Sequence, residues 1–328
     1  MRTRLSLGDV ELARAVLARH LRPTPLRASL AVPGADLRLK LECWQPTGSF
    51  KVRGATHLLT TLDDEERRRG VVAASAGNHA LGVAFAASRL GGTVQATLFV
   101  PRTAPRAKVE KLRRFPVDLR ETGETYDDAV EAARQFERQT GATFVHAYED
   151  LRTAAGQGTV GLEILDACPE AGTVLVPVGG GGLIAGLATA VKAMAPDVRV
   201  VAVQPEASPA LRESLRLGRA LLTYAAGPTL ADGLSGGIGE IAFDHRDLVD
   251  EVVTVSEEEI EDAIVALLAA DQVVAEASGA VGVAALRAGK VASAGRGAVV
   301  AVITGGNVDA SVLARLLAPR CGRAEAVP

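Results

Sequence analysis

Residues 39–55 read LKLECWQPTGSFKVRGA, and Lys51 in this segment follows a predicted tight turn. Apolar side chains alternate over residues 37–43, and this pattern predicts a strand that a proline and a glycine then end. Ser49 is the expected N-cap of a helix that begins near Phe50 and carries Lys51 in its first turn. The positive end of the helix dipole disfavours an ammonium group, so we expect a lowered pKa for Lys51. A neutral lysine amine is the group that imine formation with a carbonyl compound requires.

A second cluster of small and polar residues, ASAGNHA at residues 74–80, falls where a predicted strand meets a predicted helix. Backbone N–H groups at a helix start bind anions, and small residues let a ligand approach the backbone closely. A tight turn with Asn78 as the helix cap explains the same residues without any ligand. These residues alone are therefore compatible with both an anion site and a structural turn.

Four consecutive glycines, residues 179–182, lie between another predicted strand and helix. Successive glycines can turn several N–H groups toward one point at a helix N-terminus, where a phosphate is the natural guest. The spacing Gly180-x-Gly182-x-x-Ala185, with Glu206 near the end of the next strand, also fits a dinucleotide-binding fingerprint. An NAD-binding oxidoreductase of the Rossmann type, or a non-catalytic nucleotide-binding protein, is therefore an alternative interpretation.

A fourth segment, Thr304-Gly305-Gly306-Asn307, follows the last predicted strand. The carboxyl ends of parallel strands face ligand crevices, so this segment is a further candidate for ligand binding. A turn before a helix is the simpler explanation when the segment is considered alone.

Together these segments resemble a known family. The string PTGSFKVRGA at residues 46–55 closely resembles the cofactor-lysine segment of the fold-type II pyridoxal-phosphate enzymes. The nearest branch is the threonine/serine dehydratase and serine racemase family, and the other motifs match it in the expected order along nearly the whole chain. This resemblance explains the segment around Lys51, which the dinucleotide-binding interpretation does not.

The resemblance implies that Lys51 holds pyridoxal 5'-phosphate as an internal aldimine and later removes the α-proton of the substrate as a general base. It also implies that the glycine segment cradles the phosphate, that Thr304 faces the pyridine nitrogen, and that Asn78 reaches the ring hydroxyl. The predicted cofactor-binding residues are Phe50, Lys51, Asn78, Gly179, Gly180, Gly181, Gly182, Leu183 and Thr304. The residues predicted to bind the amino-acid substrate, chiefly its carboxylate, are Ser75, Ala76, Gly77, Asn78 and His79.

Several positions refine this expectation. Ala76 stands where serine racemases carry a second hydroxyl, and alanine has no proton to donate, so elimination is favoured over racemisation. Gln204 replaces the acidic residue that metal-using relatives supply, so we expect no tight divalent-cation site; a looser cation held by carbonyl groups remains an alternative. Leu81 stands where many relatives have glutamine, which leaves the fine shape of the pocket open. Glu276 and Asp232 resemble family positions near the active site, although helix capping or a salt bridge explains them equally well.

The composition is ordinary for an α/β enzyme with two domains: 328 residues, 48% hydrophobic and 23% charged. The net charge of -3 gives no electrostatic reason to expect nucleic acid or an anionic membrane as a partner. Cys43, Cys168 and Cys321 form no close pair and no metal-type spacing, which indicates reduced thiols in a cytoplasmic protein. The run of mixed charges at residues 63–69 is typical of a solvated helix face. We find no signal-peptide pattern and no apolar stretch of membrane-spanning length.

Strands and helices alternate along most of the chain. We expect a first helix capped by Asp9 and a later one opened by a capping box at Ser256. The other predicted strands cover residues 71–75, 94–100, 117–121, 174–178, 198–203 and 298–303, and the other predicted helices cover residues 79–90, 107–115, 125–140 and 183–194. This rhythm predicts an α/β fold of two parallel-sheet domains with the active site between them, as in the fold-type II (tryptophan synthase β-like) enzymes. We expect a discontinuous large domain, residues 1–69 and 148–328, and a small domain, residues 70–147.

The expected activity is that of a lyase, a dehydratase (ammonia-lyase) that converts L-threonine or L-serine to a 2-oxo acid and ammonia. A serine racemase or a 3-hydroxyaspartate dehydratase on the same fold remains an alternative. The family is usually dimeric, so a homodimer is expected. Nothing after residue 317 is long enough for the regulatory domain of feedback-regulated relatives, and we do not expect regulation by that route.

Overall fold

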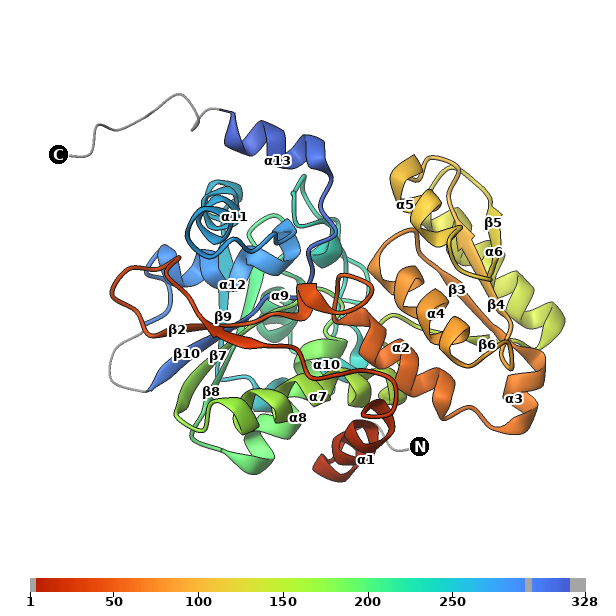
Figure 1. Ribbon diagram of the computed structural model, residues 1–328, viewed down its shortest axis with the longest axis horizontal. Helices are drawn as coiled ribbons and strands as arrows, with labels where there is room; N and C mark the ends of the chain where they lie inside the picture. The colour runs from red at the N-terminus through yellow and green to blue at the C-terminus, as the bar shows by residue number, and fades with distance from the viewer. Residues whose placement is uncertain (1–3, 293–296, 319–328) are drawn as a thin grey trace.

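The computed structural model describes residues 4–292 and 297–318, which form two sheets flanked by helices. The six-stranded sheet has the order β1-β2-β10-β7-β8-β9, and the four-stranded sheet has the order β5-β4-β3-β6. Figure 1 shows the four-stranded sheet on the right, built from one continuous stretch of chain, and the larger sheet on the left. In the described ranges no helix is long and apolar enough to cross a membrane.

The strands are β1 (Leu26–Ala28), β2 (Leu37–Lys40), β3 (Val71–Ala74), β4 (Ala96–Val100), β5 (Asp118–Glu121), β6 (Thr143–Phe144), β7 (Ala171–Pro177), β8 (Arg199–Pro205), β9 (Glu251–Val255) and β10 (Ala298–Val302). The α-helices are α1 (Leu7–Leu17), α2 (Lys51–Thr60), α3 (Asp64–Arg69), α4 (Asn78–Arg89), α5 (Arg106–Leu112), α6 (Tyr126–Thr140), α7 (Leu151–Ala167), α8 (Gly182–Met194), α9 (Ala210–Leu217), α10 (Glu240–Asp244), α11 (Glu257–Asp271), α12 (Ala277–Arg287) and α13 (Ala310–Leu317). Short 3-10 helices cover Glu42–Trp44, Asp232–Leu234 and Arg246–Leu248.

The sheets are parallel except at one edge. β10 pairs in parallel with β2 and β7, and β7, β8 and β9 continue the parallel order. The four-stranded sheet is parallel throughout, whereas β1 pairs with β2 in the antiparallel direction. Parallel strands need helical crossovers, which place helices on both faces. The predicted α/β fold with parallel sheets is confirmed.

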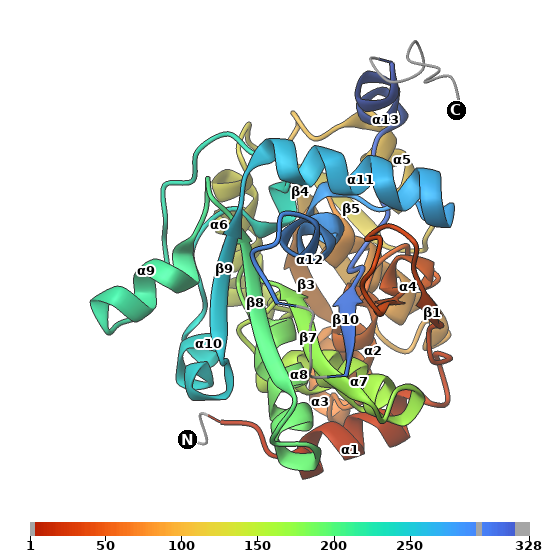
Figure 2. The same cartoon turned by 90° about the vertical axis from the view of Figure 1, so that its left-hand side faces the viewer.

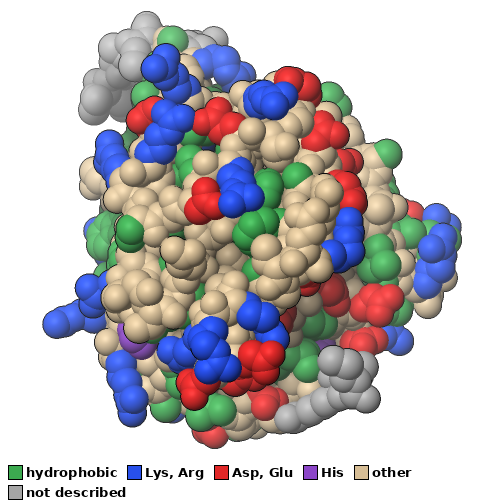
Figure 3. Space-filling view, turned by 90° about the vertical axis from the view of Figure 1, so that its right-hand side faces the viewer, with side chains coloured by type: hydrophobic (Ala, Val, Ile, Leu, Met, Phe, Trp, Pro, Cys, Tyr) green, Lys and Arg blue, Asp and Glu red, His purple; other side chains and the backbone are tan. Residues whose placement is uncertain are grey.

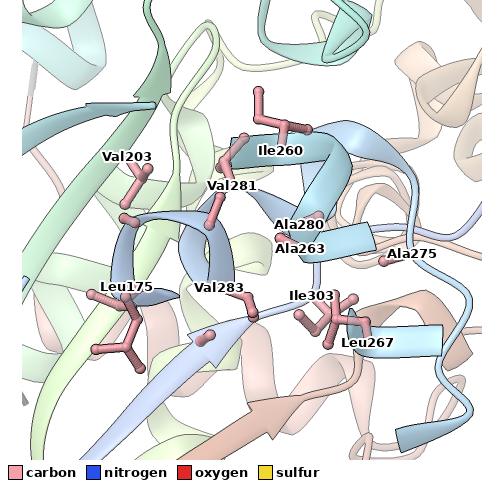
Figure 4. Packing of buried hydrophobic residues seen from close by; sticks show 14 of the residues in the cluster. Leu175, Val203, Ile260, Ala263, Leu267, Ala275, Ala280, Val281, Val283 and Ile303 are labelled. Atoms are coloured by element: carbon pink, nitrogen blue, oxygen red, sulfur yellow. The ribbon is translucent and has the colours of Figure 1, made fainter. Parts of the chain in front are cut away.

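Helices cover both faces of the six-stranded sheet, as the views in Figures 1 and 2 agree: α11 and α12 lie on one side and α7 and α8 on the other. Figure 4 shows how α12 fills the space between α11 and the strands. Its Val281 and Val283 lie among Leu175 of β7, Val203 of β8 and Ile260 of α11. Fully burying a side chain of this size contributes about 1.5–3 kcal/mol, so the packing of α12 stabilises the strands of the six-stranded sheet.

The four-stranded sheet is covered by α6 on one face and α4 on the other. α2 packs against both α4 and α7, so this one helix contacts the layers of both sheets. The face of the molecule seen in Figure 3 carries acidic and basic side chains interspersed. α3, the predicted solvated helix in residues 63–69, has a capping box at Asp63 and no buried residue, which confirms that prediction.

Two predicted features near the N-terminus are wrong in detail. α1 is capped by Ser6, and Asp9 is instead the third residue of its capping box. β2 ends at Lys40 and a 3-10 turn follows, so Cys43 is buried beside the strand end rather than in the strand. The capping box at Ser256 is confirmed.

The cysteines that the structure describes, Cys43 and Cys168, are free and buried. Burial raises the pKa of the Cys43 thiol to about 12 and that of Cys168 to about 11. Both thiols are therefore protonated and unreactive at neutral pH. Cys321 lies outside the described residues.

Candidate active site

Two of the motifs lie side by side although they are far apart in the sequence. The backbone N–H of Phe50 donates to the carbonyl of Thr304 at 3.0 Å, and the N–H of Gly306 donates to the carbonyl of Gly48 at 2.9 Å. The turn before α2 is thereby paired with the segment that follows β10. These hydrogen bonds place Lys51, the first residue of α2, beside the end of the six-stranded sheet.

The predicted cap of α2 is wrong. Phe50 occupies the N-cap position and makes no side-chain cap. The backbone of Ser49 instead forms an isolated bridge with Gly305. The Ser49 side chain is fully buried, and its hydroxyl oxygen has no hydrogen-bond partner among the described residues. Pairing with the strand end therefore delays the start of the helix by one residue.

The Lys51 amine lies in a low-polarity setting. Its Nζ donates to the carbonyl oxygen of Ala147 at 3.2 Å and lies 5.2 Å from the centroid of the Phe50 ring. Burial lowers the pKa of Lys51 to about 8, and the carboxylate of Glu276 opposes the shift. The sequence predicted this direction, but burial rather than the helix dipole is the main cause.

A buried cluster of charges fixes the start of α2. Arg53 donates to both carboxylate oxygens of Glu42 at 2.7 and 2.8 Å, and to both oxygens of Glu163 on α7 at 2.7 Å each. Lys40, at the end of β2, is 1% exposed and pairs with the same Glu163. Two cations and two carboxylates thus neutralise one another in the interior, as buried charges must. The cluster joins the end of β2, α2 and α7 next to the first turn of α2, which carries Lys51.

The cluster predicted to bind the substrate carboxylate lies at the turn from β3 to α4. Ser75 Oγ accepts from the N–H of Gly77 at 3.1 Å, and Gly77 is the N-cap of α4 without a side-chain cap. Asn78 is therefore the first helical residue and not the cap. Its side chain accepts from Asn307 Nδ2 and donates to Glu276 Oε1, both at 2.7 Å. The turn thus leaves the first backbone N–H groups of α4 without intrahelical partners.

His79 is held as a neutral imidazole. Its Nε2 lies 2.8 Å from the carbonyl oxygen of Val145, so this nitrogen carries the proton. Burial, followed by the charge of Lys51, lowers the pKa of His79 to about 3. The side chain therefore brings no positive charge to a carboxylate, and only the backbone N–H of His79 remains available.

The glycine segment forms a cradle at the start of α8. Gly181 is the N-cap with φ of 90°, and no side chain caps the helix. A Cβ on Gly181 would lie 2.3 Å from Ala242 Cβ, and one on Gly180 would lie 2.3 Å from the Tyr148 ring. The first N–H groups of a helix have no intrahelical partner and sit at the positive end of the dipole. The segment therefore fits a phosphate group.

Two further side chains lie at the segment that follows β10: Thr304 belongs to it, and the N–H of Glu276 donates to the carbonyl of Gly305 at 3.0 Å. Thr304 is 4% exposed, and its hydroxyl lies 3.4 Å from the carbonyl oxygen of Ser278. Burial, followed by the charge of Asp232, raises the pKa of Glu276 to about 7. A neutral hydroxyl and a carboxyl that titrates near neutrality are thus available in the same site.

All predicted cofactor- and substrate-binding residues line one cleft of about 1030 Å³. The size is that of a pocket for a cofactor together with a small substrate. The cleft is also lined by Tyr148, Asn307, Lys108 and Lys111, which were not predicted as site residues. Asn307 ends a quoted motif, and Tyr148 follows β6 at the carboxyl end of a parallel strand, so strand-end position was a usable signal for both. No comparable signal marked the lysines of α5.

Glu206, from the dinucleotide-binding interpretation, and Gln204, at the position of the metal ligand in relatives, both contact other protein groups. Glu206 is exposed outside the cleft lining and pairs with Lys290 at 3.3 Å, so the acidic position of the dinucleotide fingerprint is not at the site. The buried amide of Gln204 donates to the carbonyl of Val178 and accepts from the N–H groups of Leu211 and Arg212. Within the described ranges, no group of three or more His, Cys, Asp or Glu residues could hold a metal ion.

Comparison with known proteins shows which family this chain belongs to. Residues 17–305 match the family described as "Pyridoxal-phosphate dependent enzyme". The L-threonine ammonia-lyase of Thermotoga maritima is 46% identical over 318 residues, which is 95% of this chain and 78% of that protein. The structure of maize serine racemase superposes with a TM-score of 0.89 at 34% identity, covering 96% of this chain and 98% of that one. Processed threonine deaminase isoform 2 of Solanum lycopersicum superposes with a TM-score of 0.88 at 32% identity, covering 95% and 86%.

The fold and the cleft are those of a fold-type II pyridoxal-phosphate enzyme. The chain belongs to the pyridoxal-phosphate dependent enzyme family, and its similarity to threonine deaminase and serine racemase confirms the predicted branch. The site fits the cofactor, since it combines a lysine amine of lowered pKa with a glycine cradle that has no room for side chains. The predicted cofactor is confirmed by family membership, whereas the roles of individual residues stay predictions.

Proposed function

We propose that this protein is a pyridoxal-phosphate-dependent ammonia-lyase (dehydratase) that acts on L-threonine, with L-serine as the second candidate substrate. One observation carries the proposal: the amine of the half-buried Lys51, with a pKa of about 8, lies in the same cleft as a glycine cradle for a phosphate. The similarity to the Thermotoga L-threonine ammonia-lyase supports the choice of reaction and substrate.

Lys51 has two tasks in this proposal. Its unprotonated amine would hold the aldehyde of the cofactor, and once free the same amine would accept the proton from the substrate Cα. Bound pyridoxal phosphate supplies an electron-withdrawing ring that stabilises negative charge at Cα. The proton held by Lys51 can then pass to the departing β-hydroxyl, which leaves as water. The released enamine is hydrolysed to a 2-oxo acid and ammonia.

The remaining residues orient the reacting groups. The N–H groups at the start of α8 would receive the phosphate, Thr304 Oγ1 would face the pyridine nitrogen, and Asn78 Nδ2 would face the ring hydroxyl. The start of α4 binds the substrate carboxylate through Ser75 Oγ and backbone N–H groups, including that of His79. Phe50 packs beside the Lys51 amine and keeps water from it. Ala76 offers no acid on this turn, which favours elimination over racemisation.

We also propose that the chain has a large domain, residues 1–69 and 148–328, and a small domain, residues 70–147. The four-stranded sheet lies wholly inside residues 70–147, which supports this division. The homodimer expected from the family and the cytoplasmic location expected from the cysteines stay predictions. Light scattering on the purified protein tests the first, and fractionation of the native cells tests the second.

The function is tested by 2-oxo acid release from L-threonine, L-serine and 3-hydroxyaspartate, with the wild type beside Lys51→Ala. We expect the fastest release from L-threonine, and no release by the variant above its background. Lys290→Ala is the control, because Lys290 is an exposed lysine outside the cleft lining. A wild type that binds the cofactor but forms no 2-oxo acid from any of these substrates would overturn the proposed reaction.

A further inference from the structure

The chain contains only two asparagines, Asn78 and Asn307, and they are hydrogen-bonded to each other. Asn78 opens α4 beside the four-stranded sheet, whereas Asn307 follows β10 of the six-stranded sheet. Asn307 Nδ2 donates to Asn78 Oδ1 at 2.7 Å and to the carbonyl oxygen of Thr47 at 2.8 Å. The pair therefore connects the turn before Lys51 with the turn that carries the predicted substrate-binding cluster.

The orientation of the Asn307 amide is fixed by partners that have only one possible role. The carbonyl oxygen of Thr47 can only accept, so the atom that faces it must be the amide nitrogen. Lys111 Nζ can only donate, and it lies 3.4 Å from the opposite atom, Oδ1. The Nδ2 group of Asn307 has two hydrogens, and Thr47 and Asn78 take one each.

The orientation of the Asn78 amide follows from that of Asn307. Its oxygen must face the donor on Asn307, which turns its Nδ2 toward Glu276 Oε1 at 2.7 Å. Nδ2 gives one hydrogen to Glu276 and keeps a second. Flipping this amide would place two N–H donors against each other and an oxygen against the ionised form of Glu276, and both of these contacts are unfavourable.

Two glycines make room for this network. A Cβ on Gly48, which has φ of +75°, would lie 2.7 Å from Asn307 Oδ1. A Cβ on Gly305 would lie 2.2 Å from Glu276 Oε1 and 3.3 Å from Asn78 Nδ2. Side chains at either position would push the amides apart. The hydrogen-bond network around Asn78 and Asn307 thus explains why positions 48 and 305 are both glycine.

We propose that Asn307 is a positioning residue that fixes the Asn78 amide with its nitrogen, rather than its oxygen, presented to the ring-hydroxyl position of the cofactor. This inference rests on the proposed pyridoxal-phosphate site and adds a residue whose own side chain acts through Asn78. With Asn307 in place, Asn78 is a hydrogen-bond donor to the cofactor. Without Asn307, only the contact with Glu276 still holds this orientation, and a turned Asn78 amide would bring its oxygen against the ring oxygen, so that two acceptors face each other.

The test is a double-mutant cycle on cofactor affinity, measured by titrating the apoprotein with pyridoxal phosphate and following visible absorbance. The variants are Asn307→Ala, Asn78→Ala and the double variant. We expect each single variant to bind the cofactor about 10-fold more weakly, because a half-buried hydrogen-bonding group loses its partner. The double variant should be no weaker than Asn78→Ala, because Asn307 has nothing left to orient.

Asn307→Asp is the isosteric variant, since a carboxylate cannot donate to Thr47 or Asn78. It should weaken cofactor binding at least as much as Asn307→Ala and shift the pH dependence of the bound cofactor's visible absorbance. Gln139→Glu makes the same amide-to-carboxylate change at an exposed position of α6 and should change neither. Melting temperatures of the apoproteins identify a variant that has merely unfolded, and cofactor affinity does not depend on which substrate is turned over.

Additive losses in the cycle, with apoprotein melting temperatures near that of the wild type, would overturn the proposal, because they would mean that Asn307 acts independently of Asn78. Unchanged cofactor binding and spectrum in Asn307→Asp would overturn it as well. If the wild type itself binds no pyridoxal phosphate, the cofactor site fails, and that result is distinguishable from a failure of the Asn307 role.

Discussion

Arg53 and Glu42 form a two-point ion pair in the interior, with distances of 2.7 and 2.8 Å between their nitrogen and oxygen atoms. Their side chains are 2% and 0% exposed. Arg53 lies two residues after Lys51, so this pair sets the position from which the reactive amine extends. A structural ion pair and the proposed catalytic lysine therefore lie together at the first turn of α2.

Replacing Arg53 by methionine should destabilise the protein strongly. The change leaves Glu42 and Glu163 buried without their shared cation, and breaking a buried ion pair in this way costs about 3–5 kcal/mol. The measurement is urea unfolding at pH 8. Arg38→Met is the matched control, because Arg38 pairs with the exposed Asp36 and such pairs contribute about 0–1 kcal/mol. Equal losses for both variants would contradict the role of the cluster.

The rate of covalent cofactor capture by the apoprotein should depend on pH through Lys51. Because its pKa is lowered to about 8, the reactive amine is mostly protonated below pH 8 and mostly free above it. The capture rate should therefore rise about tenfold per pH unit below this value and level off above it. Stopped-flow absorbance after mixing with pyridoxal phosphate gives the profile. A rise that continues to pH 10 without levelling would indicate an unshifted lysine.

Gly181→Ala should weaken cofactor binding. The new methyl group would lie 2.3 Å from Ala242 Cβ, at a backbone φ of +90° that other residues rarely adopt. We expect the cradle to shift and affinity for pyridoxal phosphate to fall about 10-fold or more. The double change Gly181→Ala with Ala242→Gly should recover part of the affinity.

The matched control for the cradle is Gly8→Ala in α1, where the nearest atom to an added Cβ is 3.7 Å away. It adds one methyl group without a clash, so cofactor affinity should be unchanged. If Gly181→Ala binds the cofactor as tightly as Gly8→Ala, the backbone of residues 179–182 does not hold the phosphate.

Ala76→Ser should introduce racemisation of serine. The wild type has no hydroxyl at this position of the cleft, so we expect it to release no D-serine from L-serine. A serine there adds a proton donor, and a positioned acid or base contributes on the order of 100-fold to a proton transfer. Chiral chromatography of the product measures the effect. D-serine from the wild type would mean that Ala76 does not decide between elimination and racemisation.

Ala104→Ser serves as the comparison for Ala76→Ser, because Ala104 also lines the cleft but lies in the segment before α5. It should leave the ratio of D-serine to 2-oxo acid at the wild-type level. A similar rise in both variants would point to general loosening of the cleft rather than to a specific acid.

The sequence predicted the parts of the site that lie at strand ends and helix starts. Lys51, the glycines before α8 and Thr304 each follow a recognisable strand, and the parallel arrangement brings such positions to one edge. The cap of α2 could not be predicted in the same way, because the backbone of Ser49 is used by Gly305, which is 256 positions away. Local propensity does not reveal a long-range partner.

α7 was missed for a related reason. Gly156, Gly158 and Gly161 weaken its helix propensity. In the structure these glycines let α7 approach its neighbours: a Cβ on Gly158 would lie 2.7 Å from the carbonyl oxygen of Gly186 on α8, and one on Gly156 would lie 2.8 Å from Gly54 Cα on α2. Close packing of three helices therefore outweighs the propensity of the isolated segment.

The position of β10 determines when during synthesis the site can form. β10 lies between β2 and β7, so in the described sheet the β1–β2 pair contacts the other strands only through β10, which is synthesised after all of them. Residues 71–144, which carry the four-stranded sheet, can form it while the chain is still growing. The turn before Lys51 must wait for Thr304 and Gly306 to leave the ribosome. Nascent chains arrested before residue 298 should therefore hold a folded small sheet and no competence to capture the cofactor.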